Sequence, residues 1–219
     1  STTANAAKTF GGEVGPKIGA IAPGNFADLV VLNSNPLDDI AHATSIAFKA
    51  ADELIVLLGE TRGWLGQSLY LREICGREEG APPPVDLAAE RRAGEFVRAL
   101  INEGRVSAVH DLSDGGLIVA IAEMALASGI GARLYGAPNF LSEAAFWFGE
   151  DQGRYAVTVK AAGYDDLAAR AKGAGVPVRR IGITHGNALT LPGERPILLN
   201  ALRERHEGWL PAYMAGGAN

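Results

Sequence analysis

The sequence is poor in cysteine, because Cys75 is the only one among 219 residues. A single cysteine cannot form an internal disulfide, and the segment Ser1–Asn5 lacks the basic and apolar regions of a secretory signal peptide. A disulfide-stabilised secreted domain is therefore excluded, and a cytoplasmic location is expected.

Positive charge is scarce relative to negative charge. Twenty Lys and Arg residues stand against 25 Asp and Glu residues, which gives a formal net charge of −5 at pH 7 with His neutral. Because binding to a phosphate backbone depends on a cationic surface, nucleic acid is not expected as a partner. The longest apolar run, Leu117–Ala127, contains Glu123 and is shorter than the ~20 residues of a membrane-spanning helix, so no membrane partner is expected.

Apolar residues are plentiful, at 47% of the chain, and glycine is frequent, at 28 residues. This composition excludes intrinsic disorder, and the glycines lie at turns and helix ends rather than in a repeat. Helical and strand-like patterns alternate, which favours an α/β or α+β fold with helices packed on a mixed sheet. A short N-terminal β segment is expected after the turn at Pro23-Gly24 and ends at Asn33.

The expected elements follow from apolar periodicity and from turn residues. Asp86 is expected to cap a helix that Gly104 ends. Two strand-like runs, 45–50 and 53–58, flank Ala51-Asp52 and predict a hairpin. The other expected helices are 67–75, 117–128, 142–147, 164–173 and one from 201 onward, and the other expected strands are 106–109, 130–134, 154–160, 178–183 and 188–191.

The turn between the strand at 106–109 and the helix at 117–128 is a candidate binding site. Its two glycines allow close approach of a ligand, and the helix N-terminus that follows attracts anions. A phosphate there requires Mg²⁺ to offset the two aspartates, whereas ordinary capping of the helix by Ser113 or Asp114 is the favoured interpretation. The candidate residues of this turn are Asp111, Ser113, Asp114, Gly115 and Gly116.

Two further loops carry polar residues. The loop 59–68 is glycine-rich but matches neither the phosphate loop nor the dinucleotide fingerprint, so it is either an ordinary surface loop or one that faces a ligand. The segment 148–154 can bind a polar substrate or Mg²⁺, although a solvated turn is the favoured interpretation. No spacing suits zinc or a nucleophilic triad, so we assign no catalytic residue and no metal ligand.

Five segments, at 46–50, 58–73, 81–87, 108–117 and 207–214, occur in the same order as in a known family. Through them, residues 45–219 resemble the C-terminal part of the synthetase component of phosphoribosylformylglycinamidine synthase. The resemblance implies conversion of formylglycinamide ribonucleotide to its amidine in purine biosynthesis, by a carbon-nitrogen ligase that uses ATP, Mg²⁺ and ammonia from glutamine. It also implies a glutaminase and small accessory subunits as partners.

The resemblance also implies the fold of an aminoimidazole ribonucleotide (AIR) synthetase C-terminal domain. The family's catalytic and ATP-binding motifs lie upstream, so 43–219 is expected to be a fragment that is inactive without the upstream synthetase domains. A Glu-Ser-Gln turn of the family contacts the ribonucleotide, and the matching residues here make Glu150 and Gln152 candidates in a degenerate nucleotide site. A non-catalytic nucleotide-binding or interaction module is the alternative, and uncovered apolar surface makes self-association an expectation.

Residues 1–40 are similar instead to the C-terminal tail of amidohydrolases of the imidazolonepropionase type. In that family the tail adds strands to a small β-sandwich and carries no metal ligands, so an amidohydrolase remnant is the less favoured function. The sequence therefore predicts two parts, a foreign segment at 1–42 and an AIR-synthetase-like domain at 43–219.

Overall fold

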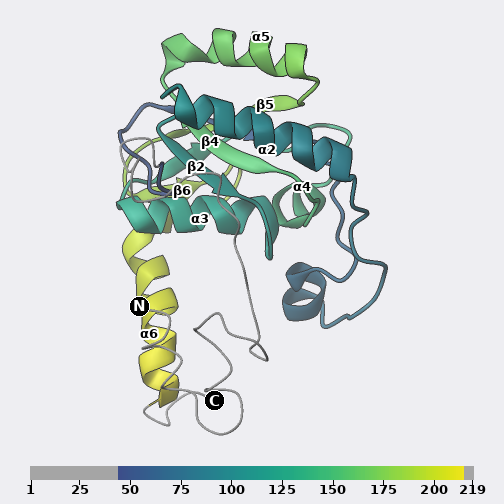
Figure 1. Cartoon of the computed structure of the whole chain (residues 1–219). Helices are drawn as coiled ribbons and strands as arrows, with labels where there is room; N and C mark the ends of the chain where they lie inside the picture. The colour runs from purple at the N-terminus through teal and green to yellow at the C-terminus, as the bar shows by residue number, and fades with distance from the viewer. Residues whose placement is uncertain (1–43, 215–219) are drawn as a thin grey trace, which may run out of the picture. The chain divides into compact units, whose positions relative to one another are not determined.

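A computed structural model describes residues 44–214 and builds them around a mixed seven-stranded sheet (Figure 1). The strand order is β2-β4-β1-β5-β3-β6-β7, and each pair is antiparallel except the parallel pair β3 and β6. This confirms the expected fold class, whereas the expected N-terminal strand lies outside the described residues. The strands are β1 (Leu54–Leu58), β2 (Ala108–Asp111), β3 (Ala132–Leu134), β4 (Tyr155–Val159), β5 (Val178–Thr184), β6 (Ala188–Thr190) and β7 (Ile197–Leu198).

β1 lies at the centre of the sheet because its side chains are apolar on both faces. All five are buried, with Ile55 and Leu57 in one core and Leu54, Val56 and Leu58 in the other. Successive side chains of a strand point to opposite faces of the sheet. The apolar side chains of β1 are therefore all removed from water only when both faces of the sheet are covered.

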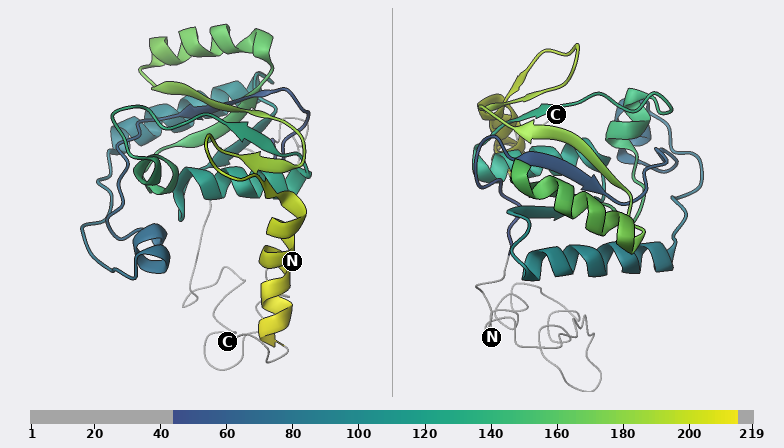
Figure 2. Two further views of the ribbon diagram at one scale, coloured as in Figure 1. Left: turned by 180° about the vertical axis from the view of Figure 1, so that it is seen from behind. Right: turned by 90° about the horizontal axis from the view of Figure 1, so that it is seen from above.

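Helices cover both faces of the sheet, as the two views in Figure 2 show. α2 and α5 contribute to the core that contains Val56, and α3 and α4 contribute to the core that contains Ile55. Within residues 44–214, no helix combines the length and the apolar character needed to cross a membrane. The helices are η3 (Tyr70–Ile74, a π-helix), α2 (Leu87–Asn102), α3 (Gly116–Ser128), α4 (Glu143–Phe148), η4 (Ala161–Gly163, 3₁₀), α5 (Tyr164–Ala174) and α6 (Leu199–Met214).

The start of α2 agrees with the sequence prediction. The Asp86 carboxylate accepts a hydrogen bond from the Ala89 amide at 2.9 Å, and this bond lowers the pKa of Asp86. At the other end, both terminal nitrogens of Arg170 donate to the Glu103 carboxylate at 2.7 Å. The two ends of α2 are thus fixed, one by its own cap and the other to α5.

The predicted hairpin at 45–58 is wrong, because only β1 forms. Residues 45–50 are irregular, and Phe48 is buried in the core beside α3, so the apolar side chains of this run serve packing rather than a strand ladder. Asp52 has a φ of 64° and donates its amide to the Thr184 carbonyl at 2.7 Å. The helix expected at 67–75 also shrinks to the single π-helical turn η3.

Candidate functional site

Three loops leave the same end of the sheet. In the antiparallel ladders, Leu58 at the end of β1 and Asp111 at the end of β2 both lie opposite Tyr155 at the start of β4. The loops that follow β1 and β2 therefore meet the loop that precedes β4. These are the three loops that the sequence indicates as candidate sites, and we call their meeting place the loop junction: residues 59–69, 112–116 and 148–154.

A buried ion pair lies at the centre of the loop junction. The side chain of Arg154 is fully buried, and its terminal nitrogen lies 3.8 Å from the Asp151 carboxylate. That carboxylate accepts the amides of Gly63 at 2.9 Å and Trp64 at 3.3 Å, so it also holds the loop after β1. Arg154 donates to the carbonyls of Asp151 and Gly149. The predicted solvated turn at 148–154 is therefore wrong, because its charged groups are partnered inside the protein.

Glu150 joins two helix starts. Its Oε1 atom accepts the amide of Leu69, which precedes η3, and the amide of Gly115, which precedes α3, each at 2.8 Å. The predicted capping of α3 by Ser113 or Asp114 is wrong, because both side chains are exposed and make no cap hydrogen bond. A carboxylate from a distant loop takes the place of the local cap.

The glycine at the start of α3 is required by the protein's own backbone. Gly116 has a φ of 72°, and a Cβ atom there would lie 2.6 Å from the Gly149 carbonyl oxygen and 2.8 Å from the Phe148 carbonyl carbon. Only glycine combines this backbone conformation with such close packing. The sequence analysis interpreted Gly116 as a residue that allows a ligand to approach. The structure gives another reason for the glycine, because the backbone of residues 148–149 occupies the space beside it.

Glu150 connects segments that are far apart in sequence. Its removal should therefore lower the free energy of unfolding more than removal of Ser113 or Asp114. We expect Glu150→Ala to lower the free energy of unfolding by about 2 kcal/mol, since the part-buried amides of Leu69 and Gly115 lose their acceptor. Glu150→Gln keeps a carbonyl oxygen at this place and should retain more than half of that stability. Ser113→Ala is the matched control and should stay within about 0.5 kcal/mol of the parent in urea unfolding. A Ser113→Ala loss as large as that of Glu150→Ala would contradict this assignment.

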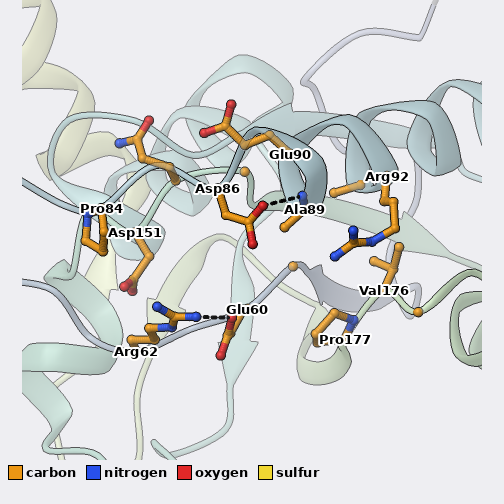
Figure 3. A pocket seen from close by; sticks show the side chains of 15 residues that line it. Glu60, Arg62, Pro84, Asp86, Ala89, Glu90, Arg92, Asp151, Val176 and Pro177 are labelled. Carbon is orange, nitrogen blue, oxygen red and sulfur yellow. Dashed lines mark hydrogen bonds and ion pairs between the residues drawn. The ribbon is translucent and has the colours of Figure 1, made fainter.

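A cavity of about 350 Å³ opens beside the loop junction, under the first turns of α2 (Figure 3). Arg62 is paired with Glu60 at 2.8 Å, and within the described part of the chain the Arg92 guanidinium has no ion-pair partner. The pairing with Arg62 lowers the pKa of Glu60. The charged residues that line the cavity are Glu60, Arg62, Asp86, Glu90, Arg92 and Asp151.

The sequence candidates differ in whether their side chains line a cavity. Gln152 lines the cavity, and Gln152 and Asp111 both line a second, smaller one of about 160 Å³. Glu150 and the two glycines line neither of these cavities and make their contacts inside the loop junction. The sequence analysis did not predict that α2 contributes Glu90 and Arg92 to the lining of the larger cavity. In the sequence, both residues have the pattern of ordinary exposed positions on an amphipathic helix.

The residues near the loop junction do not favour a phosphate group that lacks a bound metal ion. The Gly115 amide at the N-terminus of α3 already donates to Glu150, and the cavity lining holds more carboxylates than guanidinium groups. Over residues 44–214, no group of three or more His, Cys, Asp or Glu side chains is placed to hold a metal ion. We therefore derive no chemical step through a metal at this place.

A match to one known domain family identifies the family of this chain. Residues 50–190 match the family described as AIR synthase related protein, C-terminal domain, and this match covers more than half of the chain. The chain therefore belongs to the family of AIR synthase related proteins, and the part that matches is the family's C-terminal domain.

Two curated relatives are the same subunit of one enzyme. Subunit PurL of phosphoribosylformylglycinamidine synthase from Bradyrhizobium sp. strain BTAi1 is 59% identical over 182 residues, which are 83% of this chain and 25% of the relative. The PurL subunit from Rhodopseudomonas palustris strain BisA53 is 59% identical over 179 residues, which are 82% of this chain and 24% of the relative. The chain spans about a quarter of the length of these relatives.

Solved structures agree on the fold. PurL from Thermotoga maritima complexed with FGAR matches with a TM-score of 0.63 and 16% identity, over 74% of this chain and 30% of that chain. The T. maritima PurL structure complexed with ATP matches with a TM-score of 0.58 at the same identity, over 74% of this chain and 27% of that chain. At this level of identity, the similarity shows the fold alone.

Proposed function

We propose that residues 43–219 act as the C-terminal AIR-synthetase-like domain of a phosphoribosylformylglycinamidine synthase, in cytoplasmic purine biosynthesis. The observation that carries this proposal is the 59% identity over 182 residues to PurL subunits. The whole enzyme is an ATP-dependent carbon-nitrogen ligase, and this domain contributes to it as one part. We propose no role in this function for the part of residues 1–42 that lies outside the matched stretch.

The domain serves the enzyme by presenting a rigid end of its sheet. The buried Asp151–Arg154 pair and the shared cap Glu150 fix the three loops to one another, which supports a role in shaping a neighbouring site. Among the candidate residues, Gln152 and Asp111 line cavities and are the two that we propose to face a polar ligand.

We place ATP and Mg²⁺ with the parts of the synthetase outside the matched quarter. T. maritima PurL is described as complexed with ATP and with ADP, whereas here the carboxylate-rich cavity and the Glu150 carboxylate at the N-terminus of α3 disfavour a phosphate group. Turnover therefore requires the other synthetase domains, and the isolated chain is inactive. A structure of PurLQS from T. maritima supports accessory subunits as further partners.

A transplant tests the proposed function in cells. The matching C-terminal quarter of the Bradyrhizobium PurL is replaced by residues 43–219, and the hybrid gene is introduced into a bacterium that lacks its own synthetase gene. We expect growth without added purine, because 59% identity preserves the surfaces that the domain needs. The hybrid with Arg91→Met, a change at an exposed helix position, should also grow, whereas Arg154→Met should not. A folded, well-expressed hybrid that fails to support growth would overturn the proposal.

A further inference from the structure

The second half of α6 covers nothing in the described part of the domain. Leu199 is buried in the core beside α3, and Arg203 donates to the Leu126 carbonyl near the end of α3 at 2.6 Å. Beyond Arg203 every side chain that the structure describes is exposed, and the yellow helix extends away from the sheet in Figure 1. The exposed apolar side chains there are Trp209, Leu210, Tyr213 and Met214.

These exposed residues continue the helix face whose first residues, Leu199 and Leu202, pack on the core of the domain. Leu199, Leu202, His206, Trp209 and Tyr213 follow one another at intervals of three and four residues, which places them on one face of a helix. The first two pack on the core, and the last two have stacked rings with centroids 5.3 Å apart. One apolar seam therefore begins against α3 and runs past the edge of the domain.

The exposed half of α6 lacks support of its own. Pro211 lies inside the helix and removes one backbone donor, and a short helix without tertiary packing is marginal in water. The match to the general domain family ends at residue 190, so α6 lies outside the part that the family shares. Relatives at 59% identity are about four times as long as the matched stretch, which leaves a large body of the same polypeptide to cover this seam.

We propose that residues 204–214 of α6 dock through Trp209, Leu210, Tyr213 and Met214 onto an apolar groove in the rest of the synthetase polypeptide. This inference rests on the proposed function. The groove lies next to α3 in the assembled enzyme, because the docked face continues the contact of Leu199 and Leu202 with the core. α6 is thus an anchor that joins this domain to its neighbour.

Hydrogen exchange tests the docking. Exchange at the amides of 204–214 is measured in the 219-residue chain alone and in the full-length hybrid with Bradyrhizobium PurL. We expect exchange in the hybrid to be at least about 100-fold slower than in the isolated chain, because docking must open before these amides exchange. The double variant Trp209→Ala/Tyr213→Ala should lose this protection, whereas the control Glu204→Ala, on the opposite face of the helix, should keep it.

Each outcome separates the docking from the proposed function, because turnover of the hybrid is measured alongside exchange. An active hybrid whose α6 exchanges as fast as in the isolated chain overturns the docking and leaves the function standing. A protected α6 in an inactive hybrid supports the docking while the proposed function fails. Protection in the isolated chain that rises with protein concentration identifies a second copy as the occupant and also overturns the proposal.

Discussion

Arg154→Met should lower the free energy of unfolding by about 3–5 kcal/mol, the cost of breaking a buried ion pair from one side. Arg154 is fully buried, and burial lowers its pKa. Among the described residues, its guanidinium is the only group that forms an ion pair with the Asp151 carboxylate. The guanidinium also donates hydrogen bonds to the carbonyls of Asp151 and Gly149. The substitution leaves a buried carboxylate with two backbone donors and leaves two carbonyls unpaired.

Urea unfolding at neutral pH measures this effect. Arg91→Met is the matched control, because Arg91 makes an exposed pair with Glu95 and should leave the midpoint nearly unchanged. The double variant Asp151→Asn/Arg154→Met removes both charges and should recover part of the loss. If Arg154→Met is no more harmful than Arg91→Met, the loops are not held together by this ion pair.

Gly116→Ala should cost about 3 kcal/mol or more, because it adds a clash with backbone to an unfavourable backbone conformation. Gly129 is a close match, with a φ of 74° against 72° at Gly116. A Cβ atom at Gly129 meets nothing within 4 Å, whereas at Gly116 it would lie 2.6 Å from the Gly149 carbonyl oxygen. Gly129→Ala should therefore cost only about 1 kcal/mol, the penalty of the left-handed conformation.

The difference between the two alanine variants isolates the packing of the loop junction, because the conformational penalty is nearly the same in both. It is measured as the difference between two unfolding free energies in the same denaturant series. Equal losses would mean that the loop 148–149 can move aside, and the interpretation of Gly116 as a site for close approach of a ligand would regain its force.

Features that depend on neighbours in sequence were predictable. The cap at Asp86 and the buried run of β1 depend on residues within one turn or one strand, so local rules find them. The family resemblance is confirmed by the match over residues 50–190 and by the PurL relatives. The three loops were each recognisable from glycine and charge.

Features that depend on distant contacts were not predictable. Glu150 accepts the amides of residues that lie 81 and 35 positions away in sequence, and no local pattern distinguishes such a carboxylate from a ligand-binding one. Arg154 looked solvated because charged residues are usually exposed, and only the fold shows that the loops 148–154 and 59–69 enclose its side chain. The hairpin prediction failed because Phe48 fills a core that the sequence does not reveal.

Whether this domain works only inside a synthetase is decided most directly by one turnover assay. Formylglycinamide ribonucleotide, ATP and ammonia are supplied to equal amounts of the 219-residue chain and of the full-length hybrid. The account predicts no turnover by the chain alone and a rate within about tenfold of the parent enzyme for the hybrid. Turnover by the isolated chain, or a folded hybrid without turnover, would contradict it.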